Sequence, residues 1–140
     1  MTIIFEKIVP TACQIEELFK LLLSRVHNIS HQVMPSYGEH SEFVNKHPYR
    51  VWYLMHKNNR YIGTVYLTYE NSIGINTNDD LIDELLLRII DKIKSEFEPL
   101  PPIKSIRANH FSINVSPSNR AMILALDKNN YQIAQITYQV

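Results

Sequence analysis

Glycine is scarce in this chain of 140 residues. Only three occur, Gly38, Gly63 and Gly74, where an average chain of this length would carry roughly ten. No two of them lie closer together than eleven positions. This spacing excludes a Walker A loop, the dinucleotide-binding glycine fingerprint and other phosphate sites built from clustered glycines.

Cysteine is scarcer still, with Cys13 as its one occurrence. An internal disulfide is therefore excluded, which fits a cytoplasmic protein. Cys13 falls at a predicted helix start with no base nearby, and this favours a structural thiol over a nucleophile. Residues 1–9 lack the basic region and cleavage site of a signal peptide. No apolar run approaches the roughly 18 residues that span a bilayer.

The chain also lacks an excess of charge of either sign. Its 14 Lys and Arg residues balance 14 Asp and Glu residues. A neutral chain is a poor candidate for binding nucleic acid or an anionic membrane. Hydrophobic residues make up 45% and charged residues 20%, which is typical of a globular protein. The length suits a single domain over residues 1–140.

The hydrophobic pattern predicts alternating strands and helices. Asn58-Asn59 is a two-residue hairpin signal, and Asn78 is expected to cap the longest helix. The order of the elements indicates an α/β sheet with both faces covered. The predicted elements are, in chain order, a strand over 3–9, helices over 12–26 and 36–46, strands over 50–57, 61–69 and 72–77, a helix over 79–97, a strand over 105–115, a helix over 118–128 and a strand over 131–140.

Two stretches of the sequence carry a family resemblance. Residues 119–131 (NRAMILALDKNNY) contain an Asn, an amphipathic helix and a break before the last strand, and Ile113-Asn114-Val115 precedes them. With the element order, they resemble the ending of the GNAT superfamily of acetyl-CoA-dependent N-acetyltransferases. Residues 30–75, which include Glu39-His40 and Ile73-Gly74-Ile75, resemble the subgroup that acetylates amino groups on nucleotide-linked sugars for surface polysaccharides.

The resemblance implies a GNAT-like mixed sheet of about six to seven strands with helices on both faces. It implies an N-acyltransferase that moves an acetyl group from acetyl-CoA to a primary amine on a nucleotide-linked amino sugar. In this family the fourth and fifth strands splay, and amides of the fourth strand pair with the pantetheine arm of the cofactor. By resemblance, the cofactor-binding residues are Ile73, Gly74, Ile75, Asn76, Thr77, Asn78 and Asn119. The structural alternative for residues 73–77 is that they form an ordinary central strand. For Asn119 the alternative is that it caps the last helix.

Residues 76–83 depart from the family pattern. The family places Arg or Gln and glycines at the start of the long helix, where free amides and the helix dipole attract the cofactor diphosphate. This chain has NTNDDLID there, without Gly or Arg. The acids stabilise the helix end themselves and repel phosphates. A second interpretation therefore stands beside the enzyme: a catalytically degenerate GNAT-like binding or interaction module that does not use CoA normally.

The expected acid of the reaction is also altered. The family often places a Tyr eight residues into the last motif, where it protonates the leaving thiolate. Counted from Asn119 as one, that position is Leu126, and leucine cannot donate a proton. The resemblance then leaves Tyr131 or Tyr138 for this step, unless the step is not catalysed.

Histidines supply the expected base. Glu39 and His40 fall where the sugar-acetylating subgroup has a Glu-His pair near the substrate, and a neutral His40 could take the proton directly or through water. The structural alternative is a surface histidine on a short helix. His31 and Met34 are expected to line the acceptor cleft. His27 and His31 lie four apart, but a zinc site needs further ligands, and we expect no metal.

The expected partner is a small-molecule amine. Apolar strand edges, including residues 131–140, leave a homodimer open, because an exposed edge recruits partners.

Overall fold

The computed structural model describes residues 2–24 and 34–140. These form a five-stranded sheet in the order β1-β2-β3-β4-β5. The elements are β1 (Ile4–Lys7), α1 (Ala12–Leu23), α2 (Tyr37–Asn45), β2 (Val51–Lys57), β3 (Arg60–Leu67), β4 (Ser72–Thr77), a 3₁₀ turn (Asp79–Leu81), α3 (Ile82–Glu96), β5 (Ser112–Ile113) and α4 (Arg120–Lys128). None of the described helices is long and apolar enough to cross a membrane.

Strands β1 to β4 form an antiparallel meander, and β5 joins it in parallel after the crossover through α3. The hairpin between β2 and β3 turns at Asn58 and Asn59, which have φ angles of 52° and 61°. Positive φ at both central residues is the geometry that matches the twist of a two-residue hairpin. The predicted hairpin is therefore confirmed.

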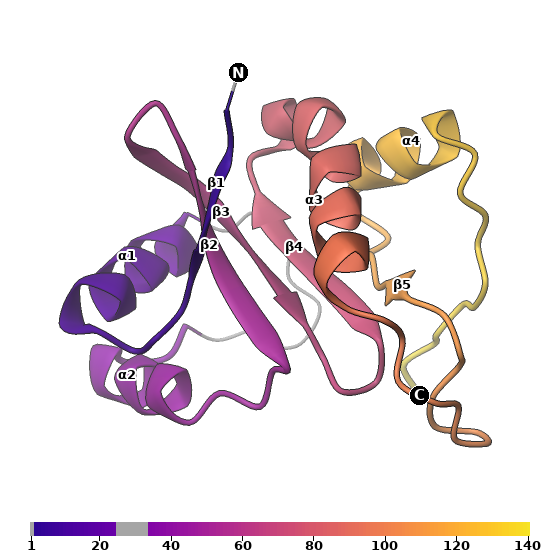
Figure 1. Ribbon diagram of the computed structural model, residues 1–140, viewed down its shortest axis with the longest axis horizontal. Coiled ribbons are helices and arrows are strands. Elements are labelled where there is room, and N and C mark those ends of the chain that lie inside the picture. Colours follow the sequence, from indigo (N-terminus) through magenta and orange to yellow (C-terminus); the bar gives the residue numbers. More distant parts are fainter. Residues whose placement is uncertain (1, 25–33) are drawn as a thin grey trace.

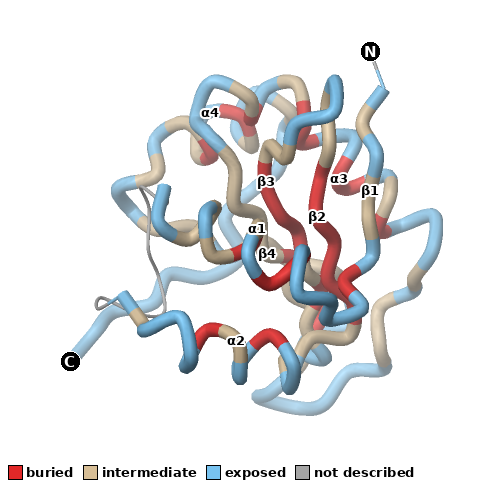
Figure 2. The backbone as a smooth tube through the Cα atoms, turned by 90° about the vertical axis from the view of Figure 1, so that its left-hand side faces the viewer, coloured by how far each residue is buried: buried red, intermediate tan, exposed pale blue. Residues whose placement is uncertain are grey.

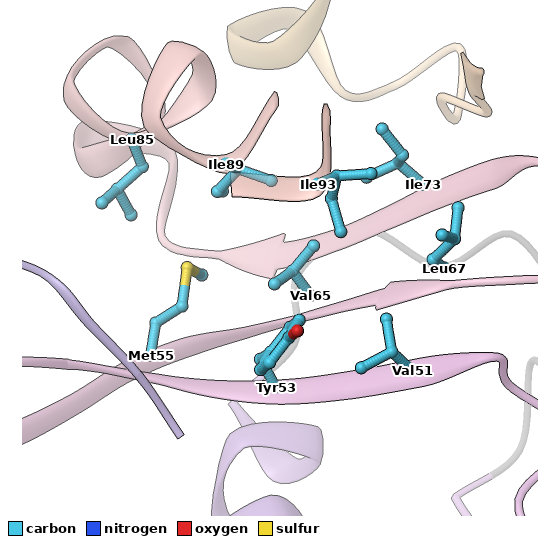
Figure 3. Packing of buried hydrophobic residues seen from close by; sticks show 9 residues of the cluster. All are labelled: Val51, Tyr53, Met55, Val65, Leu67, Ile73, Leu85, Ile89 and Ile93. Carbon is cyan, nitrogen blue, oxygen red and sulfur yellow. The ribbon is translucent and has the colours of Figure 1, made fainter. Parts of the chain in front are cut away.

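Helices cover both faces of the sheet, as predicted, with α1 and α2 on one face and α3 and α4 on the other (Figure 1). Burial is concentrated in residues 51–55 of β2, in the second half of β3 and along one stripe of α3 (Figure 2). On the α3 face, three residues of the helix stripe pack onto six strand residues (Figure 3). The cluster comprises Val51, Tyr53, Met55, Val65, Leu67, Ile73, Leu85, Ile89 and Ile93. On the other face Ile15, Leu18 and Val44 pack on Trp52 and Leu54.

The helix starts follow local side-chain chemistry. Thr11 and Ser36 each form a capping box with the residue three positions later, which fixes the starts of α1 and α2. Asn119 caps α4. Asn78 makes no side-chain cap bond, which corrects the prediction. Its carbonyl oxygen instead accepts from the Leu81 amide at 3.0 Å, so the long helix begins as a 3₁₀ turn.

The strand count is lower than the six to seven expected. The predicted strand over 105–115 shrinks to β5, because side-chain bonds hold the residues before it as a loop. The Asn71 side chain donates to the carbonyls of Leu100 and Ala108 at 3.0 and 2.9 Å. Residues 131–140 form no strand, and no backbone hydrogen bond joins residues 132–140 to another described residue.

Candidate active site

Strands β4 and β5 separate soon after they meet. They pair only at Ser72–Ser112 and Ile73–Ile113. Beyond this point β4 continues to Thr77, while the residues that follow β5 turn away from β4 toward α4. The sheet therefore opens between these two strands, as the resemblance implied.

The register of the sheet determines which backbone N–H and C=O groups of β4 point into this opening. The Ser72 carbonyl accepts from the amide of Thr68 on the β3 side at 2.9 Å. Because N–H and C=O groups alternate sides along a strand, those of Ile75 and Thr77 point to the β5 side. Since β5 ends at Ile113, these two N–H groups face the opening with no sheet partner beside them.

A cavity of about 550 Å³ fills the opening. Residues 75–82 form one wall, from the end of β4 to the first turn of α3. Asn114 and Asn119 come from the chain that leaves β5. Leu21 of α1, Met122 of α4 and the β2–β3 hairpin also line the cavity. The volume is within the range of small-molecule sites.

Charges of both signs line this cavity. Asp79 and Asp80 stand at the helix start, and Lys57 and Arg60 flank the hairpin turn. Lys57 Nζ lies 3.1 Å from Glu84 Oε2, whereas Arg60 has no ion pair among the described residues. The hairpin thus brings positive charge to a site whose helix start is acidic.

Five of the predicted cofactor-binding residues line the cavity: Ile75, Asn76, Thr77, Asn78 and Asn119. Ile73 and Gly74 do not. The Ile73 side chain lies in the core beneath α3, and the Tyr66 ring covers Gly74. Asn119 Oδ1 accepts from the Met122 amide at 3.2 Å, so this residue caps a helix and borders the cavity at once.

The predicted base lies elsewhere. His40 is 5% exposed, and therefore is not the surface histidine of the structural alternative. Its Nε2 lies 3.1 Å from the Ile15 carbonyl oxygen, and its ring centroid is 5.2 Å from that of Phe19. Burial lowers the pKa of His40, and the hydrogen bond to Ile15 offsets part of this shift. Glu39 accepts from the Ser36 amide at 3.1 Å in the capping box.

The other predicted site residues that the structure describes are not part of the cavity lining either. The Tyr131 amide donates to the Leu126 carbonyl at 3.0 Å, and its side chain is exposed beyond α4, as is that of Tyr138. Met34 is exposed. His31 lies outside the described residues. The catalytic and acceptor-binding roles of these residues stay predictions.

The sequence analysis missed the hairpin wall. Tyr61 lines the cavity beside the two basic residues, and its hydroxyl donates to Glu6 Oε1 at 3.3 Å. His56 Nε2 lies 2.8 Å from the same oxygen. Burial raises the pKa of Glu6, but the bonds from Gln14, His56 and Tyr61 outweigh it, so the net pKa is lowered. The sequence did contain a signal for this wall, because Lys57 and Arg60 flank the predicted turn at Asn58-Asn59.

Within the described part of the chain, no group of three or more His, Cys, Asp or Glu residues could hold a metal ion.

No protein-family model and no curated protein matches this sequence. The fold is similar to the crystal structure of a possible acetyltransferase from Clostridium difficile 630. The TM-score is 0.61, the similarity covers 100% of this chain and 97% of that chain, and the sequences are 10% identical. At this identity the likeness concerns the fold. The fold class expected from the sequence is confirmed: a GNAT-like mixed sheet with helices on both faces, here with five strands.

Proposed function

We propose that this chain is an N-acyltransferase that moves an acetyl group from acetyl-CoA to a primary amine. The observation that carries the proposal is the opening between β4 and β5, where the N–H groups of Ile75 and Thr77 face a cavity of about 550 Å³. The fold similarity to a possible acetyltransferase supports it.

The residues of the cavity fit an extended, amide-bearing arm. A strand whose N–H groups lack a neighbour binds such an arm as it would bind another strand. Ile75 and Thr77 would hold it from one side, and Asn119 would border it on the other. Acetyl-CoA supplies the activated acetyl thioester.

The diphosphate of the cofactor needs positive charge that the helix start does not provide. Asp79 and Asp80 repel phosphates there. Lys57 and Arg60 line the same cavity and supply cationic groups from the hairpin. In this proposal the hairpin takes over the role that the family gives to an Arg and glycines at the helix start.

The finer assignments rest on the sequence resemblance. They are a nucleotide-linked amino sugar as acceptor, His40 with Glu39 as base, and Tyr131 as acid. His40 is buried and hydrogen-bonded, so it would act on an acceptor only through water. We propose the sugar acceptor as the first compound to test, among other primary amines.

The test is transfer of acetyl groups from acetyl-CoA to a panel of amines, with product detected by mass spectrometry. The panel contains a nucleotide-linked amino sugar, simple alkylamines and a peptide with a free N-terminus. Cys13 is exposed, so a colorimetric assay of released CoA with a thiol reagent uses the Cys13→Ser variant. An acetylated product supports the enzyme, and intact acetyl-CoA with every amine contradicts it.

A second candidate function is a GNAT-like binding module without catalysis. Two observations favour it: the acids Asp79 and Asp80 in the cavity wall, and Leu126 packed against the α3–α4 core where the family often has a Tyr. The module predicts no acetylated product with any amine.

A further inference from the structure

The C-terminal segment, residues 131–140, is extended and unpaired. Every residue in it is exposed, with Ile133 at 77%, Ile136 at 69% and Tyr138 at 81%. No backbone hydrogen bond joins residues 132–140 to another described residue. Figures 1 and 2 show it running along the outside of the molecule.

This segment has the composition of a strand with no protection against pairing. Residues 129–140 contain no charged residue, no proline and no glycine. Charged residues and prolines usually keep an exposed strand from pairing with another strand. From Ala134 onward its side chains alternate, with apolar residues at the even-numbered positions and polar residues at the odd-numbered ones, whereas Ile133 breaks this pattern. The apolar set is Ala134, Ile136, Tyr138 and Val140, and the polar set is Gln135, Thr137 and Gln139.

The same chain carries a free sheet edge. The sheet order ends at β5, whose Ser112 amide donates to the Asn71 carbonyl toward β4 at 3.0 Å. By alternation, the backbone groups of Ile113 point away from β4 to the open side. The side chains of Phe111, Ile113 and Val115 meet the core that α3 and α4 cover. A strand added here would continue that core.

We propose that residues 131–140 of one copy pair with the β5 edge, residues 111–115, of a second copy, and that the exchange is reciprocal. In the described part of each chain, residues 131–140 are extended and unpaired although the outer edge of β5, in the same chain, is open. Reciprocal exchange gives hydrogen-bond partners to both the segment and the β5 edge, and it closes the assembly as a two-fold dimer.

The first test measures the mass and the amide protection of the full chain. Light scattering is expected to give twice the chain mass of 16.4 kDa. Hydrogen exchange is expected to show slow amides in residues 131–140 and around Ile113. A monomer overturns the proposal, including a monomer whose segment is protected in its own sheet. A dimer with fast exchange in the segment also overturns it.

Matched variants locate the contact. Ile136→Lys places a charge on the apolar side of the strand, and we expect it to weaken dimerisation by about tenfold or more. Gln135→Lys puts the same charge on the polar side and is expected to leave the dimer intact. Truncation after Asn130 is expected to give a monomer with unchanged circular dichroism in the helical region. A dimer that survives the truncation, or equal effects of the two lysine variants, overturns the proposal.

Discussion

The ring of Tyr66 lies directly over the backbone of Gly74, its partner on the neighbouring strand. A Cβ atom at Gly74 would overlap the ring atoms. The ring cannot easily move away, because it stacks on Tyr49 with centroids 4.0 Å apart and planes 9° apart. One of the three glycines is therefore required by a packing contact, and not by a turn or a phosphate.

Replacing this glycine should destabilise the fold. Gly74→Ala forces the Tyr66 ring out of its stack, and we expect a loss of about 1–3 kcal/mol in the free energy of unfolding. Gly38→Ala is the matched control, because a methyl group there would lie 4.0 Å from Ser36 Oγ, an ordinary contact, and alanine favours a helix. Urea titration of both variants checks this. Equal stability of the two would contradict the contact.

Acid should destabilise the fold through His40. Burial lowers its pKa in the folded state, whereas the unfolded chain keeps a value near 6.5. Below that pH the unfolded state binds a proton that the folded state does not, so stability falls as pH drops from about 6.5 toward the folded pKa. His47 is shifted in the same direction and contributes to the slope.

The variant His40→Gln separates the two histidines. Glutamine can still donate to the Ile15 carbonyl but does not titrate. We expect a flatter dependence of melting temperature on pH between about 5 and 7 than in the native chain. His47→Gln is the control for the remaining slope. If His40→Gln leaves the dependence of melting temperature on pH unchanged, burial of His40 does not cause the loss of stability in acid.

Removing positive charge from the hairpin should weaken acetyl-CoA binding. Arg60 is exposed at the cavity, so Arg60→Ala should raise the dissociation constant by about two- to fivefold. The loss should shrink at high salt, since exposed charges are screened. Lys104→Ala removes an exposed charge that does not line the cavity and should change nothing. Equal affinities of the two variants would remove Arg60 from the site.

Removing negative charge from the helix start should have the opposite effect. Asp80→Asn keeps the size of the side chain and abolishes repulsion of phosphate, so the dissociation constant should fall by about two- to fivefold. Asp91→Asn on α3 is the control, because Asp91 does not line the cavity. Calorimetry on both variants decides. Weaker binding in Asp80→Asn would mean that the acid helps to bind the ligand.

Much of the fold was predictable because its signals are local. The capping residues Thr11 and Ser36, the Asn58-Asn59 turn and the apolar stripe of α3 each act within a few positions of the chain. The last third was less predictable. The loop before β5 is set by Asn71, whose side chain bonds to residues 29 and 37 positions later. The pattern of residues 131–140 does not reveal whether a partner strand is available.

The candidate site was predictable in part, through the family resemblance. The resemblance placed cofactor contacts at residues 75–78 and Asn119, and the structure brings the end of β4 and the start of α4 to one cavity. His40 was placed near the substrate from the local Glu-His pair alone. Whether the His40 side chain faces a cavity or α1 depends on how α1 and α2 pack together. A local sequence motif does not contain this information. The wall around Lys57 and Arg60 likewise depends on strand pairing.

Calorimetric titration with acetyl-CoA tests the central claim, that the opening between β4 and β5 binds this cofactor. We expect saturable heat at one site per chain. Ligand at one hundred times its dissociation constant should stabilise the fold by about 2.7 kcal/mol, visible as a rise in melting temperature. No heat and no change in melting temperature at millimolar acetyl-CoA would contradict the claim.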